Sequence, residues 1–245
     1  MEFLLPLLFF FIAFIYSSIG MGGGSSYTVL MTIFGVNYLI IPIASLSLNL
    51  IVSSIGILNF WRNGHGRIDL IVPFLVTSIP MAYFAGSLNL TKGIFQLILL
   101  ITLILLVVRI YLLEEVKFSF HLSGTKKWIF MYSLGGVLGF IAGSVGIGGG
   151  IYLVPLIIIF GLGNEKEAAA AGTIFIWANS LSGIIAKSKI GTFDFEFIFP
   201  LICAVIGGGF FGSYLGSFKF QGKTIQKTMG AVIIFAILFL CRGFL

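Results

Sequence analysis

Long apolar runs recur along the whole chain and decide which fold it can adopt. The run FQLILLITLILLVV, from Phe95 to Val108, contains no charged side chain. Similar runs of about 17 to 22 residues are each long enough to cross a hydrocarbon core of roughly 30 Å as a helix. They do not alternate apolar and polar residues, as the strands of a membrane barrel would. The sequence therefore predicts an all-α polytopic membrane protein whose main partner is the lipid bilayer.

The charged residues are few and lie in short loops between these runs. They make up 9% of the chain, with a formal net charge of +6, while 59% of the residues are hydrophobic. Basic residues in short loops are typical of membrane topology signals, so no nucleic-acid partner is expected. No Asp, Glu, Lys, Arg or His falls in the middle of a confident run. This pattern argues against an embedded proton carrier and against an intramembrane enzyme, and no metal or other cofactor is expected.

A glycine-rich motif interrupts the apolar sequence at two equivalent places. SIGMGGGS at Ser18 to Ser25 is repeated as SVGIGGGI at Ser144 to Ile151, a shift of 126 positions. Around them, 22 residues align without a gap and 11 are identical. Further along, a shift of 127 pairs Ser53 with Ser180 and Pro73 with Pro200. The chain is therefore interpreted as a tandem repeat.

The two repeats are expected to form one integrated membrane domain. The first spans residues 1–115, a charged cytoplasmic linker loop spans 116–127, and the second spans 128–245. Each half contains five apolar segments, with the first two forming a glycine-broken hairpin. In the first half they fall at about 3–19, 25–41, 43–61, 69–88 and 93–113. An odd number of segments makes the second half enter the membrane from the opposite side, so the repeats are expected to be inverted.

The Lys and Arg residues test this topology, because cytoplasmic loops carry the excess of basic residues. The inverted arrangement divides the 14 basic residues ten to four, whereas four crossings per half and a parallel repeat would divide them nine to five. The inverted arrangement is favoured, and it places both termini outside the cytoplasmic membrane. The count leaves open whether the glycine-flanked segments cross fully or are re-entrant, since both give an odd number of crossings.

The glycine motifs have two interpretations. Non-helical backbone at membrane depth is tolerated only where it is buried in protein or lines a cavity, and the helices that resume at Ser25 and Ile151 would direct N–H groups into such a cavity. Broken helices at matching places in two inverted halves are typical of a transporter's substrate site. The alternative is that glycines only allow helices to pack closely. Close packing is the preferred interpretation for two other sets, Gly135, Gly139 and Gly143, and Gly208, Gly212 and Gly216.

Polar side chains near the motifs complete the candidate substrate site. Ser45, Asn49 and Ser53 fall one turn apart on one face of an expected helix, with Thr173, Asn179 and Ser180 as rough counterparts in the second half. Buried asparagine needs partners in lipid, so substrate contact and interhelical hydrogen bonding both remain open for Asn49 and Asn179. The predicted substrate-binding residues are Gly22, Gly23, Gly24, Ser25, Ser26, Asn49, Ser53, Gly148, Gly149, Gly150, Tyr152, Thr173, Asn179 and Ser180. No catalytic residue is predicted.

These motifs resemble a known family. GSVGIGGGIYLVPLII, followed by AAAAGTIFIWANSLSGIIAKSKIGTFD and GGGFFGSYLG, is similar to the TauE/SafE family of membrane transporters, also called sulfite exporters. The resemblance covers nearly the whole chain and implies transport of small sulfur-containing anions, such as sulfite or organosulfonates, across the cytoplasmic membrane. The family's glycine motif falls on Gly146, Gly148, Gly149 and Gly150. The first half departs from the pattern, because no proline follows its glycines and SLSLNL replaces Ala-Gly-Thr.

Two functions are therefore expected from the sequence. The first is a secondary transporter that moves a small sulfur-containing oxyanion by alternating access, with the anion held by backbone N–H groups and neutral side chains. The alternative is a passive channel for anions or small solutes. Besides the anion and the lipid, a second copy of the chain is a candidate partner as a homo-oligomer. Substrate identity, direction and coupling ion are not encoded in any motif.

Overall fold

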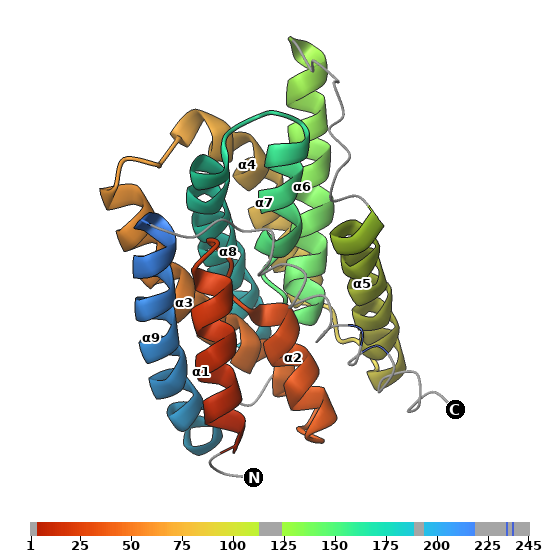
Figure 1. Cartoon of the computed structure of the whole chain (residues 1–245). Helices are drawn as coiled ribbons and strands as arrows, with labels where there is room; N and C mark the ends of the chain where they lie inside the picture. Colours follow the sequence, from red (N-terminus) through yellow and green to blue (C-terminus); the bar gives the residue numbers. More distant parts are fainter. Residues whose placement is uncertain (1–3, 113–123, 189–193, 219–233, 235–236, 238–245) are drawn as a thin grey trace.

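The computed structural model describes residues 4–112, 124–188, 194–218, 234 and 237. These residues form helices and loops, with no strand among them, so the predicted all-helical fold is confirmed. The helices run in chain order through the described residues (Figure 1). They are α1 (Leu4–Ser17), α2 (Gly24–Ile33), α3 (Ile41–Arg62), α4 (Ile68–Gly86), α5 (Lys92–Leu112), α6 (Thr125–Val145), α7 (Gly150–Ile159), α8 (Glu165–Lys187) and α9 (Phe195–Phe218). Most of the linker predicted at 116–127 lies outside the described residues.

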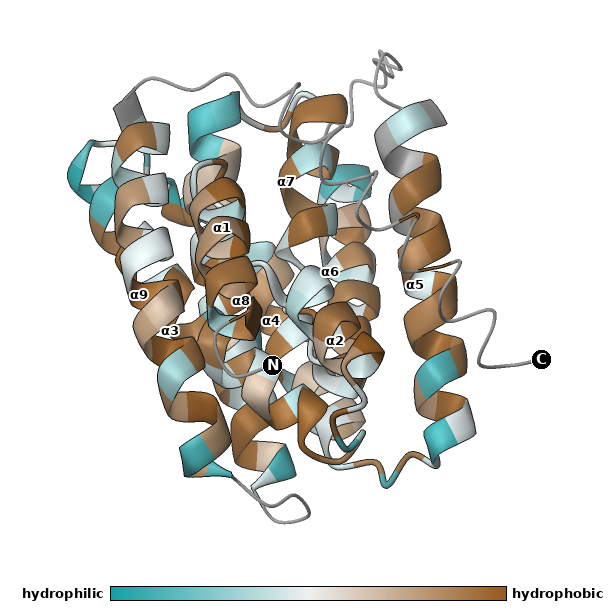
Figure 2. Cartoon of the chain, turned by 60° about the horizontal axis from the view of Figure 1, so that its bottom comes forward, coloured by the Kyte–Doolittle hydropathy of each residue, from teal (hydrophilic) through white to brown (hydrophobic). Residues whose placement is uncertain are grey.

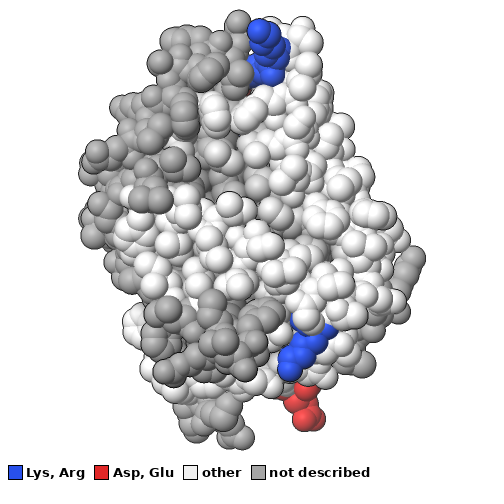
Figure 3. Space-filling model, turned by 90° about the vertical axis from the view of Figure 1, so that its right-hand side faces the viewer, with Lys and Arg blue, Asp and Glu red and all other residues white. Residues whose placement is uncertain are grey.

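Five of these helices are long and apolar enough to cross a membrane, namely α3, α4, α6, α8 and α9. Figure 2 shows hydrophobic residues along most of the length of the helices, with many of the hydrophilic residues near the helix ends. Among the described residues on the face shown in Figure 3, charged side chains appear toward the two ends, and those between them are uncharged. This is the distribution expected of a protein whose middle contacts lipid.

The helices that follow the glycine motifs are short. α2 and α7 each have 10 residues, so each is about 15 Å long and cannot cross a hydrocarbon core of roughly 30 Å. α2 lies toward the amino-terminal end of α1, whereas α7 lies toward the amino-terminal end of α6 (Figure 1). The second apolar segment, expected at 25–41, is therefore wrong in extent, because its helix ends at Ile33. This geometry favours hairpins that dip in and return.

Helices of the first half pack mainly on helices of the second. α1 packs along α9, and α6 packs along α4, while α3 and α8 cross at the centre. α3 also contacts α9, and α8 contacts α4. The contact of α1 with α9 thus corresponds to that of α6 with α4. Likewise, the contact of α3 with α9 corresponds to that of α8 with α4. Among the described residues, the main hydrophobic core cluster draws on both halves.

Glycine allows α6 to pack closely along α4 and α9 to pack closely along α1. A Cβ added at Gly135, Gly139 or Gly143 would meet backbone atoms of α4, and one at Gly208, Gly212 or Gly216 would meet backbone atoms of α1 or of the residue after it. Backbones approach this closely in membranes because small residues leave room for van der Waals contact. The prediction that these six glycines serve close packing is confirmed. The partner carbonyls belong to Phe74, Ser78, Ala82, Phe10, Phe14 and Ser18.

Candidate functional site at the joint of two glycine loops

Two loops break the helical structure, and each packs on a helix of the other half. The first loop, residues 18–23, lies on α8, where a Cβ on Gly20 would be 2.5 Å from the Cα of Ala169. The second loop, residues 146–149, lies on α3, where a Cβ on Gly146 would be 2.9 Å from the Cα of Pro42. The loops therefore cross between α3 and α8. We call this crossing the glycine joint.

Asn49 of α3 lies inside the glycine joint and is fully buried. A Cβ on Gly22 would be 2.5 Å from its Oδ1, and one on Gly148 would be 2.8 Å from its Nδ2. A Cβ on Gly24 would also collide with that nitrogen. Glycines from both loops thus leave room for one side-chain amide. Its Nδ2 donates a long hydrogen bond of 3.4 Å to the carbonyl oxygen of Gly146, while its Oδ1 has no partner among the described residues.

Ser45 ties the two loops together one helical turn before Asn49. Its Oγ lies 2.8 Å from the carbonyl oxygen of Gly146 and 3.1 Å from that of Gly24, so it can donate to either. It accepts a hydrogen bond of 3.1 Å from Thr28 of α2. Ser45 was predicted to lie on the same helix face as Asn49, but it was not among the predicted substrate-binding residues. The structure gives it direct contact with the second loop and with the start of α2, which follows the first loop.

The glycines at the joint also supply backbone conformations that other residues avoid. Gly23 and Gly149 precede α2 and α7 in the left-handed region, with φ of 87° and 72°. Because glycine has no side chain, neither helix start carries a side-chain cap. α2 begins at Gly24 and α7 at Gly150, each one residue earlier than expected. The positive ends of two helix dipoles therefore lie at the glycine joint.

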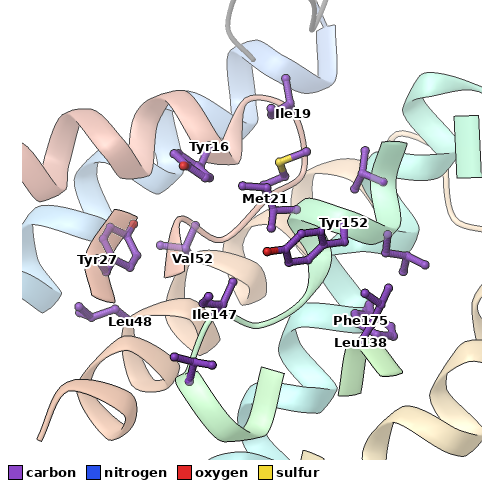
Figure 4. Close-up of a cluster of buried hydrophobic side chains, with 14 of the residues drawn as sticks. Tyr16, Ile19, Met21, Tyr27, Leu48, Val52, Leu138, Ile147, Tyr152 and Phe175 are labelled. Atoms are coloured by element: carbon purple, nitrogen blue, oxygen red, sulfur yellow. The ribbon is translucent and has the colours of Figure 1, made fainter. Parts of the chain in front are cut away.

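Apolar side chains fill the space between the loops. Met21 of the first loop and Ile147 of the second are buried, as is Ile176 of α8. Figure 4 shows Met21 and Ile147 in one cluster with Tyr152. Ile176 contacts the Cβ positions of Gly22, Gly148 and Gly150. The glycine joint is therefore closely packed in this structure.

Several predicted site residues in the first half and in α7 engage other parts of the protein. Ser25 and Ser26 lie 3.3 and 2.7 Å from the hydroxyl of Tyr16 in α1. Tyr152 donates from its hydroxyl to the carbonyl oxygen of Thr102 in α5. Ser53 donates to the carbonyl oxygen of Asn49 on its own helix, at 2.6 Å. Their hydroxyls stabilise the hairpins and helices around the joint.

The predicted polar residues of α8 do not join Asn49. Thr173 donates to the carbonyl oxygen of Ala170, and its methyl group packs on Gly56 of α3. Asn179 is fully buried and donates to the carbonyl oxygen of Phe175 on its own helix at 2.8 Å. Ser180 is buried as well, and neither its hydroxyl nor the Oδ1 of Asn179 has a partner among the described residues.

The structural counterpart of Asn49 in α8 is Ile176, so pairing Asn49 with Asn179 was wrong. The shift of 127 residues that pairs Ser53 with Ser180 also pairs Asn49 with Ile176 and Ser45 with Gly172. This signal was present in the sequence. Ile176 contacts both loops from one side, as Asn49 does from the other. The joint is thus polar on its α3 side and apolar on its α8 side.

Gly22→Ala is expected to destabilise the protein, and Asn49→Ala is expected to offset part of that effect. The new methyl group would lie 2.5 Å from the Asn49 Oδ1, and Gly22 has no positive φ that would add backbone strain. Overpacking of this kind costs about 1–3 kcal/mol. Thermal unfolding in detergent of both single variants and the double variant gives the coupling, expected at about 1 kcal/mol or more. Strictly additive effects would contradict the contact.

Comparisons with known proteins relate the chain to membrane transporters. The family model described as Sulfite exporter TauE/SafE matches residues 5–240. The chain is 28% identical over 232 residues to the probable membrane transporter protein y4hK of Sinorhizobium fredii, covering 94% of each chain. It is 26% identical over 240 residues to the probable membrane transporter protein YjnA of Bacillus subtilis, covering 88% of this chain and 90% of that one. No solved structure matches. The chain belongs to the TauE/SafE family of membrane transporters.

Proposed function

We propose that the protein is a secondary transporter that moves a small sulfur-containing oxyanion or organosulfonate by alternating access at the glycine joint. The observation that carries this proposal is the meeting of two uncapped helix starts at one buried amide, Asn49. Helix N-termini bind anions because their first N–H groups lack partners and their dipoles favour negative charge. The family name supports the substrate class.

The chemistry of the joint favours a small anion. Its polar groups are backbone N–H groups, the Ser45 hydroxyl and the Asn49 amide, and none of the described residues that line it carries a charge. Such donors stabilise an oxyanion without a counter-charge that would hold it too tightly for release. A cationic substrate would face two positive helix ends, which is unfavourable.

The arrangement of the two halves supports alternating access. We infer inverted repeats from the odd number of segments and from the ten-to-four division of basic residues, which places both termini outside the cytoplasmic membrane. The exchanged contacts of α1 with α9 and of α6 with α4 are those that related halves of opposite orientation would make. Rocking of such halves around a central site is the common mechanism of this architecture.

The packing of the joint favours a carrier over a channel. Met21, Ile147 and Ile176 occupy the space between the loops, so an anion can enter only when these side chains move. Coupling of substrate entry to such a rearrangement gives saturable exchange. A channel would show neither saturation nor counterflow.

Counterflow in proteoliposomes tests the proposal. Vesicles preloaded with unlabelled sulfite, sulfate or an alkanesulfonate should accumulate the labelled anion transiently, and Ser45→Ala should reduce the initial rate by roughly 5- to 20-fold, as expected for loss of a hydrogen bond of about 1–2 kcal/mol. Ser47→Ala is the matched control, because Ser47 lies on the same helix and donates only to the carbonyl oxygen of Ile43. Equal rates in both variants, or uptake that never exceeds equilibrium, would reject the carrier model.

A further inference from the structure

A cavity of about 300 Å³ opens at one end of the molecule, away from any predicted site residue. It lies between the loop before α3, the end of α4, the start of α5 and the last residue of α8. This volume is at the small end of the range of ligand sites. Its lining residues are Tyr38, Leu39, Pro42, Gly86, Leu88, Asn89, Leu90, Thr91, Phe95, Ser144 and Lys187. We call it the Lys187 pocket.

Lys187 is the one ionisable cation among these lining residues, and none of them is acidic. Its Nζ makes a long hydrogen bond of 3.5 Å to the carbonyl oxygen of Gly86. Among the residues that the structure describes, no carboxylate lies within ion-pairing distance of it. The pocket therefore holds a half-buried positive charge without a counter-charge, together with the polar groups of Tyr38, Asn89 and Thr91. Such a site attracts an anion.

The Lys187 pocket reaches the glycine joint through two residues. Pro42 lines the pocket and packs against Gly146 of the second loop. Ser144 also lines it and lies two residues before that glycine, near the end of α6. The wall of the pocket is therefore in contact, through Pro42, with the second loop of the glycine joint.

The opposite end of the molecule is tied by contacts between the halves. The indole nitrogen of Trp61, at the end of α3, donates to the carbonyl oxygen of Ala170 at 3.2 Å. Lys166 of α8 donates to the carbonyl oxygen of Gly216 in α9. The 127-residue shift pairs Phe60, a fully buried side chain, with Lys187. At this end, the position equivalent to Lys187 therefore holds a buried aromatic side chain, Phe60.

An ion-pair cluster adds to the closure of that end. Arg67 lies 2.7 Å from Asp69 and 3.3 Å from Glu167 of α8, and it also donates to the carbonyl oxygen of Leu162 at 3.5 Å. The hydrogen bond with Asp69 raises the pKa of the Arg67 guanidinium, so this cation stays charged. The loop before α4 is thereby held to the start of α8. Among the described residues, one end is held together by these contacts, while the other presents the Lys187 pocket.

We propose that the Lys187 pocket is an entry site that binds a small oxyanion or sulfonate before it reaches the glycine joint, with Lys187 as the selectivity-determining residue. This inference rests on the proposed transport of a small anion. In this proposal, the anion enters from the end of the molecule at which α4 and α8 finish and α5 starts. Lys187 attracts the anion, Asn89 and Thr91 offer hydrogen-bonding groups, and the second glycine loop forms the barrier behind it.

Charge-selective labelling of a cysteine in the pocket tests the proposal. Asn89→Cys is made in a background in which Cys203 and Cys241 are alanine, and its labelling rates are measured with a sulfonate-bearing and a trimethylammonium-bearing methanethiosulfonate. The ratio of anionic to cationic rates should fall about 5- to 10-fold on Lys187→Gln and recover on Lys187→Arg. Sulfate or an alkanesulfonate should slow labelling when Lys187 is present and not when it is glutamine.

Two controls separate a built site from general surface charge. Lys92→Gln removes the same charge from an exposed position at the start of α5 that does not line the pocket, and it should change the ratio less than 2-fold. Ser87→Cys, on the same loop but outside the lining, should show no protection by anions. Equal effects of Lys187→Gln and Lys92→Gln would overturn the proposal.

The labelling result and the transport result can fail independently. Counterflow without a Lys187-dependent labelling ratio would leave the transporter proposal intact and reject the entry site. Lys187-dependent protection without counterflow of any tested anion would support an anion site in the pocket and reject the proposed function.

Discussion

Gly208→Ala is expected to lower the midpoint of thermal unfolding in detergent by roughly 5–10 °C, whereas Gly209→Ala should leave it unchanged or raise it slightly. A Cβ on Gly208 would collide with the carbonyl oxygen of Phe10 and lie 3.0 Å from the Cβ of Ala13. Backbone cannot move aside as a flexible side chain can, so α1 and α9 must separate along their length. A Cβ on Gly209 lies at an ordinary 3.6 Å from side chains of α3, and alanine gains up to about 1 kcal/mol over glycine within a helix.

The same comparison on α6 provides an independent check. A Cβ on Gly135 would collide with the carbonyl oxygen of Phe74 and lie 2.6 Å from Thr77 Oγ1, but one on the adjacent Gly136 finds its nearest neighbour, Met81, at 3.8 Å. Gly135→Ala should therefore destabilise and Gly136→Ala should not. If adjacent glycines in either pair responded alike, the close helix contacts would be rejected, because general helix propensity would then explain the result.

Asn49→Leu is expected to reduce anion exchange by at least about 10-fold while the purified protein remains folded and monodisperse. Leucine has the same branched shape but is larger than asparagine and provides no hydrogen bond, and losing a hydrogen bond to a charged group costs about 1.5–3 kcal/mol. Asn49 is fully buried, and its Nδ2 donates only a long hydrogen bond of 3.4 Å to the carbonyl oxygen of Gly146. This amide nitrogen can therefore donate a hydrogen bond to an anion in the glycine joint. Initial rates of exchange at several substrate concentrations measure the effect.

Asn63→Leu is the matched control for this variant. Asn63 follows α3, is exposed, and donates only to the carbonyl oxygen of Asn59. Its replacement should leave exchange within about 2-fold of the unsubstituted protein. Full activity of Asn49→Leu with unchanged substrate dependence would exclude the glycine joint as the binding site. Loss of folded protein would instead assign Asn49 to packing.

The sequence predicted the helical fold and the location of the glycine loops because both depend on local properties. Apolar runs of sufficient length form helices in lipid. The repeated glycine motif marked where two of them break, although Gly207, Gly208 and Gly209 are also adjacent and stay helical within α9. The boundary of α2 was missed because residues 34–40 are as apolar as the helix before them, and only the structure shows the chain turning at Gly35, where φ is 73°. Hydropathy alone cannot distinguish a half-span helix from a full one.

The composition of the glycine joint depended on contacts between residues more than 90 positions apart. Ser45 bonds to Gly146, and Asn49 fits against Gly148. Helix periodicity placed Ser45 and Asn49 on one face of a helix, but it could not identify the residues that pack against that face. Chemical type suggested Asn179 as the counterpart, whereas spatial equivalence follows the repeat register and selects Ile176. Residue type identifies equivalent positions of two repeats only when both positions carry similar side chains.

The crossing of the two loops also determines when the protein can become stable during its synthesis. The first glycine loop leaves the ribosome long before Ala169, the residue on which Gly20 packs, has been made. At about 5–20 residues per second, this delay is roughly 7–30 s. During this delay, the amino-terminal hairpin has a non-helical glycine loop at membrane depth. The helix on which α1 packs, α9, is made later still. The amino-terminal hairpin therefore cannot reach its final packing until the second half has been made.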